Sequence, residues 1–202
     1  MRTRLTRAEQ VGRNRDLLLA AARRVFLDRG YSGATLDAIA EEAGFSKGVV
    51  YSQFAGKADL FLALLEQRIE QRAEENERVA EGLAGADAVA ALLAAAYRDA
   101  QADSGWPMLL VEFRAHAARD PAINARYARA HARAIEQLSA VLAGVHHKAG
   151  LEPALPPRRM AEFVLAMGPA VTLERAVDPA ALPLDMLEQL VQGALGLSVR
   201  PD

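Results

Sequence analysis

The stretch from residue 35 to residue 57, TLDAIAEEAGFSKGVVYSQFAGK, constrains the fold more than any other part of the chain. Its first half places apolar residues at helical spacing, and Thr35 before it can accept an unpaired amide of the first turn. Gly44 then ends this helix, because a residue without a Cβ atom adopts the left-handed conformation without strain. A second helix follows from Ser46 to about Phe54. Two short helices joined by a tight turn that contains glycine form a helix-turn-helix.

The second helix of this pair offers a surface that suits the major groove of DNA. Val50 and Phe54 are four residues apart and can face the first helix. The set of residues that points away is short, nearly uncharged apart from Lys47, and without a long acidic side chain: Lys47, Gly48, Val49, Ser52 and Gln53. Backbone at Gly48 can approach closely, Val49 can meet a thymine methyl group, and Lys47 can donate to guanine. An ordinary helical hairpin inside a bundle would show the same spacing, so the spacing alone leaves that alternative open.

A longer motif includes these two helices and the start of a third. It consists of Thr35-Leu36-Asp37-Ala38-Ile39-Ala40, Ala43-Gly44, Ser46-Lys47-Gly48-Val49-Val50-Tyr51, Phe54, Lys57 and Leu60-Phe61. Over about residues 12 to 65, the chain resembles the DNA-binding domain of tetracycline-repressor-like (TetR/AcrR) regulators. The resemblance implies that Lys47, Gly48 and Val49 read bases and that Ser52 does either. Phosphate contacts are implied for Thr35, Ser46, Tyr51 and Lys57, and less strongly for Gln53.

The charge of the chain is unevenly distributed. The net charge of −2 at first argues against a polyanionic partner, but residues 1–24 alone carry a surplus of +5, which leaves −7 for the rest. A basic arm ahead of the first helix can neutralise phosphates or enter a minor groove, while an acidic body limits binding to DNA in general. For about residues 1–8, a solvated disordered tail is the alternative, and both interpretations can hold together.

Composition favours helix almost everywhere, because alanine is abundant and aromatic residues make up only 5% of the chain. No segment alternates as a strand would, so we expect an all-α fold of about nine helices. The predicted helices span residues 16–29, 35–43, 46–54, 57–85, 87–103, 107–119, 121–150, 158–176 and 184–197. In the first, the expected buried stripe is Leu17, Leu18, Ala21, Ala22, Val25 and Phe26. The expected domains are a flexible basic arm (1–12), a helix-turn-helix DNA-binding domain (13–60) and a helical ligand-binding and dimerisation body (61–202).

Several classes of function receive no support. The absence of cysteine excludes disulfides and thiolate metal sites and fits a cytoplasmic location, and no apolar run is long enough for a membrane span. There is no glycine-rich phosphate loop and no Gly-x-Ser-x-Gly elbow, so we expect no enzyme. Glu112, His116 and His131 lack the Glu-x-x-His spacing of di-iron bundles, and His146 and His147 are adjacent on a helix. We therefore expect neither a metal nor a cofactor.

The last two predicted helices carry apolar faces that have to be buried, either on the chain's own body or on a second copy. These faces comprise Met160, Phe163, Val164, Met167 and Val171, followed by Leu187, Leu190, Val191 and Ala194. Reading DNA favours the second copy, because a two-fold dimer recognises two half-sites about one helical turn apart or a multiple of that. The resemblance likewise implies a homodimer joined by a four-helix interface.

The middle of the chain, residues 87–150, is the candidate body for a small-molecule ligand. Most large side chains outside the helix-turn-helix lie there: Tyr97, Trp106, Met108, Leu109, Phe113, Tyr127 and His131. Phe163 and Met167 can join them, and Arg114 and His116 are the polar candidates to orient a ligand. For each residue, simple core packing is the alternative. Together with the resemblance, these features predict a repressor that an unidentified small-molecule effector releases from a near-palindromic operator in double-stranded DNA. A ligand-binding helical bundle or interaction module without DNA binding is the alternative.

Overall fold

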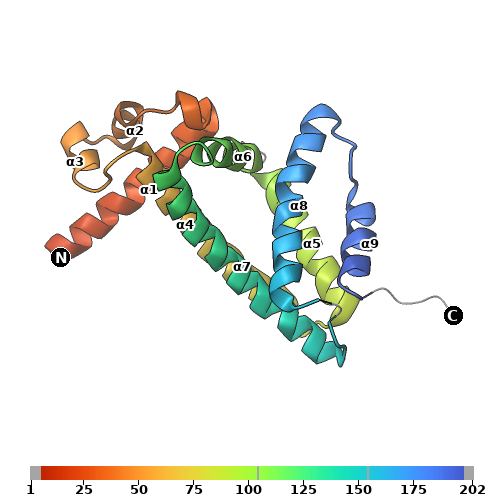
Figure 1. Cartoon of the computed structure of the whole chain (residues 1–202). Helices are drawn as coiled ribbons and strands as arrows, with labels where there is room; N and C mark the ends of the chain where they lie inside the picture. Colours follow the sequence, from red (N-terminus) through yellow and green to blue (C-terminus); the bar gives the residue numbers. More distant parts are fainter. Residues whose placement is uncertain (1–5, 104, 154, 198–202) are drawn as a thin grey trace. The chain divides into compact units, whose positions relative to one another are not determined.

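In a computed structural model of the protein, the structure describes residues 6–103, 105–153 and 155–197, and this part of the chain is all-helical (Figure 1). The predicted fold class and the predicted number of helices are confirmed for these residues. The nine helices are α1 (Arg7–Gly33), α2 (Leu36–Ala43), α3 (Lys47–Tyr51), α4 (Lys57–Ala80), α5 (Gly85–Ala102), α6 (Gly105–Ala117), α7 (Pro121–Ala149), α8 (Pro157–Val177) and α9 (Leu184–Ala194).

These helices form two compact units. Unit 1 contains the residues up to Gln67 together with Glu112–Tyr127, and unit 2 contains Arg68–Val111 and the residues from Ala128 onward. Helices α4, α6 and α7 therefore each contribute residues to both units. The division expected from sequence was linear, with everything after residue 60 in one body. In the structure, residues 61–67 and 112–127 belong with the helix-turn-helix.

Helix α1 begins much earlier than the predicted residue 16. Thr6 and Glu9 form a capping box, in which Thr6 Oγ1 accepts from the amide of Glu9 and the Glu9 carboxylate accepts from the amide of Thr6. Hydrogen bonds from the Thr6 backbone and hydroxyl lower the pKa of Glu9. Residues 7–12 of the expected arm are thus helical, and residues 1–5 lie outside the described part.

The core of unit 1 is built around α1. Leu18, Ala21, Ala22, Val25 and Phe26 are buried as predicted, but Leu17 is 46% exposed. The buried stripe is centred slightly further round the helix than the sequence pattern indicated, so that it contains Leu19 instead of Leu17.

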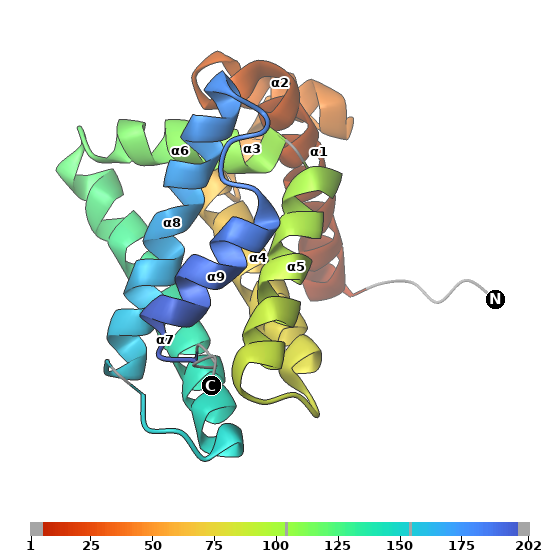
Figure 2. The same ribbon diagram turned by 90° about the vertical axis from the view of Figure 1, so that its right-hand side faces the viewer.

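Unit 2 has a separate core to which α4, α5, α7, α8 and α9 all contribute, and α5 packs against α9 (Figure 2). His146 is a buried polar residue of this unit. Its ring nitrogens lie 2.9 Å from the carbonyl oxygens of Leu142 and Leu195, and this bridge ties α7 to the end of α9. Helix α9 ends at Ala194 instead of the predicted residue 197, and Gly196 after it is left-handed. No described helix has the length and apolar character that crossing a membrane requires.

Candidate functional site

Helices α2 and α3 form the helix-turn-helix, and local chemistry fixes the turn between them. Thr35 Oγ1 accepts from the amide of Ala38 at 3.1 Å, which caps α2 as predicted. Gly44 has φ of 68°, and its amide and that of Phe45 donate back to Glu41 and Ala40 at 3.0 and 2.9 Å. These two backbone hydrogen bonds end α2, and the backbone then turns into the connection to α3.

Helix α3 is shorter than the predicted 46–54 segment, but its two faces are those expected. Val50 is fully buried and Phe54 is 4% exposed. Arg15 of α1 lies over the Phe54 ring, 4.7 Å from its centre. The opposite face is accessible: Ser46, Lys47, Gly48, Tyr51 and Ser52 are exposed, and Val49 and Gln53 are half-buried. The short outward surface needed for groove insertion is therefore present.

Two polar residues of this face already have partners within the chain. The Lys47 ammonium donates to Asp37 of α2 at 2.5 Å, and this hydrogen bond raises the pKa of Lys47. Because both side chains are more than half exposed, the pair is weak and its lysine is available to a phosphate or base. The Ser52 hydroxyl donates to the Val49 carbonyl oxygen at 2.7 Å, so its proton is engaged within the helix.

Lys57 differs from the other predicted phosphate contacts. Its ammonium donates to the carbonyl oxygens of Tyr31 and Ser32, at 2.7 and 3.2 Å, at the end of α1. The same ammonium lies 4.6 Å from the centre of the Tyr31 ring. Burial lowers the pKa of Lys57. Two of its three N–H groups are thus used to join α4 to α1.

Four of the predicted ligand residues lie in unit 1: Phe113, Arg114, His116 and Tyr127. Phe113 is fully buried, stacks on Phe61 with ring centres 4.1 Å apart, and meets the Tyr31 ring edge-on at 5.0 Å. Burial, together with the negative charge of Asp120, raises the pKa of Tyr31 to about 12. The rings of Phe113, Phe61 and Tyr31 form an aromatic core. Phe113 is therefore a core residue in this structure, which is the alternative that the sequence left open for it.

The remaining predicted ligand residues lie in unit 2: Tyr97, Trp106, Met108, Leu109, His131, Phe163 and Met167. Trp106 is 6% exposed, and the guanidinium of Arg68 lies 5.2 Å from the centre of its ring. The Tyr97 ring lies 4.8 Å from the guanidinium of Arg175, which also donates to the carbonyl oxygens of Ala181 and Leu182. Met108, His131 and Met167 are half-buried, and Phe163 is 40% exposed.

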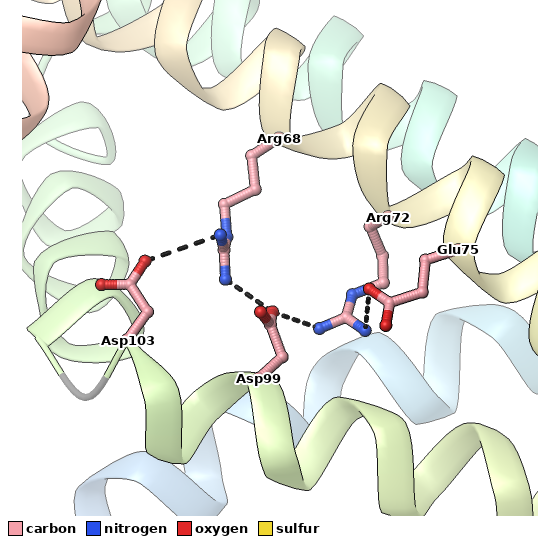
Figure 3. Close-up of polar contacts among 5 residues, drawn as sticks. All are labelled: Arg68, Arg72, Glu75, Asp99 and Asp103. Carbon is pink, nitrogen blue, oxygen red and sulfur yellow. Dashed lines mark hydrogen bonds and ion pairs between the residues drawn. The ribbon is translucent and has the colours of Figure 1, made fainter.

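A charge network beside Trp106 was missed by sequence reasoning (Figure 3). Asp99 of α5 accepts from both Arg68, at 2.6 Å, and Arg72 of α4. Arg68 also faces Asp103 at 3.5 Å, and Arg72 faces Glu75 at 3.4 Å. The signal was present in the sequence, because two arginines four residues apart and two aspartates four residues apart lie on single helix faces. Which helices would meet was not evident from spacing.

The predicted dimer residues divide into two groups. Met160, Leu187 and Val191 are at most 9% exposed and belong to the chain's own core, so they offer a partner little surface. Phe163, Leu190 and Ala194 are exposed, and Val164, Met167 and Val171 are half-buried. Three further exposed apolar residues on the same two helices were missed: Leu173, Val177 and Met186.

No cluster of three or more potential metal-binding side chains occurs among the residues that the structure describes.

Two family models match the chain. Residues 18–64 match "Bacterial regulatory proteins, tetR family", and residues 85–197 match "BetI-type transcriptional repressor, C-terminal". The first segment covers α2 and α3, and the second covers most of unit 2.

Individual relatives are similar to about a third of the chain. The chain is 46% identical over 67 residues to the HTH-type transcriptional activator FasR of Mycolicibacterium smegmatis, covering 33% of this chain and 29% of FasR. It is 37% identical over 65 residues to the HTH-type transcriptional repressor AcnR of Corynebacterium diphtheriae, covering 32% of this chain and 34% of AcnR. The matched segment thus spans about a third of each relative.

The whole fold has known counterparts. The transcriptional regulator FadR from Bacillus subtilis, solved in complex with stearoyl-CoA, superimposes with a TM-score of 0.72 over 91% of this chain and 97% of FadR. Sequence identity is 18%, so this likeness concerns the fold alone.

Proposed function

Because this chain belongs to the TetR family of transcriptional regulators, we propose that it binds an operator in double-stranded DNA through α3 and represses transcription until a small molecule binds unit 2. We propose that it does so in the cytoplasm, as a regulator and not as an enzyme. The observation that carries the proposal is the division of residues 46–54 into a buried face, Val50 and Phe54, and an accessible face on which Lys47, Gly48 and Ser52 are exposed.

On the accessible face, the position and chemistry of each side chain indicate whether it contacts a base or a phosphate. Lys47, Gly48 and Val49 occupy the first turn of α3, the part of a recognition helix that meets base edges. Thr35, Ser46 and Tyr51 are exposed around it and carry hydroxyl groups that can donate to phosphates. Gln53 is half-buried, and the proton of the Ser52 hydroxyl is engaged by Val49, so both are secondary contacts.

A homodimer completes the proposed reading of DNA. Helix α3 is five residues long and reaches too few base pairs by itself, whereas two copies related by a two-fold axis read two half-sites. The α8–α9 face supplies an apolar surface of the kind that dimers bury, with Leu173, Val177, Met186 and Leu190 all more than 40% exposed.

We place the effector in unit 2, near Trp106 and Tyr97. Trp106 lies against Arg68 and Tyr97 lies against Arg175, so each aromatic ring has a fixed positive charge beside it. FadR, a regulator of the same fold, was solved in complex with stearoyl-CoA, and this supports a small-molecule ligand for the present chain. A ligand that favours one arrangement of the dimer would shift DNA affinity through its differential binding.

Selection from a random DNA pool by the full chain tests this function. We expect enrichment of a near-palindromic sequence whose half-sites lie about one helical turn, or a multiple of it, apart. The rival, a helical ligand-binding module without DNA affinity, predicts that no sequence is enriched above the starting pool. Enrichment of a single asymmetric half-site would retain DNA binding and overturn the two-fold dimer.

A further inference from the structure

We propose that Glu112 of α6 and Arg126 of α7 are positioning residues that hold the two ends of the helix-turn-helix, so that α3 is presented in one fixed orientation. The inference rests on the proposed function and adds to it a part of the chain far from the motif in sequence. Both residues belong to unit 1, the unit that contains α2 and α3.

The entry to the helix-turn-helix is the kink at the end of α1. Gly30 has φ of 68° and ψ of 172°, a non-helical conformation that breaks the helix immediately before Tyr31. That amide donates to Glu112 Oε2 at 2.8 Å. A hydrogen bond to a charged acceptor is roughly twice as strong as a neutral one, so the carboxylate stabilises the kinked backbone.

The kink is at a glycine because L side chains rarely adopt its φ of 68°. A Cβ atom on residue 30 would also lie 2.8 Å from Glu112 Oε2 and would displace the end of the side chain that accepts from Tyr31. The carboxylate therefore occupies the place of the missing side chain. Since Lys57 of α4 binds the carbonyl oxygen of Tyr31, both backbone polar groups of this residue are held, the amide by α6 and the carbonyl by α4.

The exit from the helix-turn-helix is held by a chain of two contacts. Ala55, directly after the buried Phe54, donates its amide to Asp59 Oδ2 at 2.8 Å. The other oxygen of Asp59 forms an ion pair with the guanidinium of Arg126. Asp59 is thereby fixed between α7 and the backbone that follows α3, and its side chain is only 20% exposed.

In the sequence, the contacts at Tyr31 and Ala55 lie on either side of the helix-turn-helix. Tyr31 lies four residues before the N-cap of α2, and Ala55 lies four residues after the last residue of α3. With both anchor points fixed by residues 112–127, the backbone between them has fewer orientations available. Loss of either anchor should therefore weaken the reading of sequence more than the attraction to phosphates, which depends on charge and not on exact placement.

The test compares full-length variants with charge-matched controls. Glu112→Ala removes the acceptor, and Glu112→Gln keeps an oxygen that can accept from Tyr31. Glu66→Ala, at an exposed glutamate of the same unit, controls for the lost charge. Arg126→Gln is matched by Arg119→Gln at an exposed arginine of the same unit.

The readout is the ratio of affinities for the pool-selected duplex and for a shuffled duplex, with folding checked by circular dichroism. We expect the ratio to fall about tenfold for Glu112→Ala and for Arg126→Gln, because each variant loses one charged hydrogen bond. Both control variants should keep the wild-type ratio, and Glu112→Gln should keep most of it. Ratios within about twofold of the wild type for both variants would overturn the inference.

Amide hydrogen exchange of the DNA-free protein decides the same question independently of any operator. Glu112→Ala should accelerate exchange at residues 31–55 while the α8–α9 amides stay as in the wild type. Unchanged exchange in that segment overturns the positioning role even if the protein proves not to bind DNA. If the wild type shows no sequence preference but the exchange result holds, the proposed function fails and the positioning contacts stand.

Discussion

The ammonium group of Lys57 and the carbonyl oxygen of Tyr31 are joined by a 2.7 Å hydrogen bond that connects the first turn of α4 to the end of α1. The same ammonium rests on the Tyr31 ring, with 4.6 Å to its centre, and reaches the Ser32 carbonyl oxygen. Sequence reasoning assigned Lys57 to a DNA phosphate. In the structure, the Lys57 ammonium instead binds backbone carbonyl oxygens of the protein itself.

The Lys57→Ala variant should therefore lose stability. We expect the unfolding free energy to fall by about 1–2 kcal/mol in urea titrations, because two carbonyl oxygens lose a charged donor in a partly exposed place. The slope of log affinity for DNA against log salt should equal that of the wild type. A slope flattened by about one counterion would return Lys57 to the phosphate contacts.

Tyr31 should make the folded state sensitive to alkaline pH. Its folded pKa is raised to about 12, mainly by burial, against an ordinary value of 10. Between these values the unfolded chain has released the phenolic proton and the folded chain has kept it, so the unfolding free energy falls as pH rises. Below pH 10 the contribution is intact.

The measurement is the wild type against Tyr31→Phe in urea unfolding across this pH range. The phenylalanine variant cannot ionise at this position, so its stability should fall by about 2–3 kcal/mol less than that of the wild type. Tyr51→Phe, at a tyrosine that is 57% exposed, should keep the wild-type profile. Parallel profiles for wild type and Tyr31→Phe would contradict the raised pKa.

The accessible face of α3 gives a prediction that separates bases from phosphates. Val49→Ala should cost about 1–3 kcal/mol at particular base pairs of the selected duplex, because a methyl contact in the groove is lost. Binding to random duplex should not change, since a valine does not neutralise phosphate. Equal losses on both duplexes would show that Val49 does not read sequence.

The α8–α9 face should hold two copies together. Leu190→Glu places a charge on an apolar surface that the dimer would bury, so sedimentation should show monomers at concentrations where the wild type is dimeric. Leu155→Glu is the matched control, because Leu155 is similarly exposed, 49% against 47%, but lies in the segment between α7 and α8. A dimeric Leu190→Glu protein would exclude this face.

Local signals predicted the parts of the structure that depend on near neighbours. Thr35 caps α2 and Gly44 turns left-handed because each requirement involves only the adjacent turn of backbone. The capping box of Thr6 and Glu9 had an equally local signal, a Thr-x-x-Glu pattern, which the interpretation of an arginine-rich tail passed over.

Contacts across long sequence separations were not predictable from spacing. Glu112 and Tyr31 are 81 residues apart, and no periodicity indicates that a glutamate of α6 holds a backbone amide of α1. The same limit applied to Phe113, a large apolar residue that suited either a ligand wall or a core. Its stacking on Phe61 could be known only once helices α4 and α6 were seen to share unit 1.

The central claim is that α3 reads sequence, and the most direct measurement is the affinity of the full chain for the pool-selected duplex and for a shuffled duplex of equal composition. Both should be measured at the same stated salt concentration, since phosphate attraction alone varies steeply with salt. We predict an affinity ratio of at least about 10³ in favour of the selected duplex. Equal affinities for the two duplexes would contradict the account.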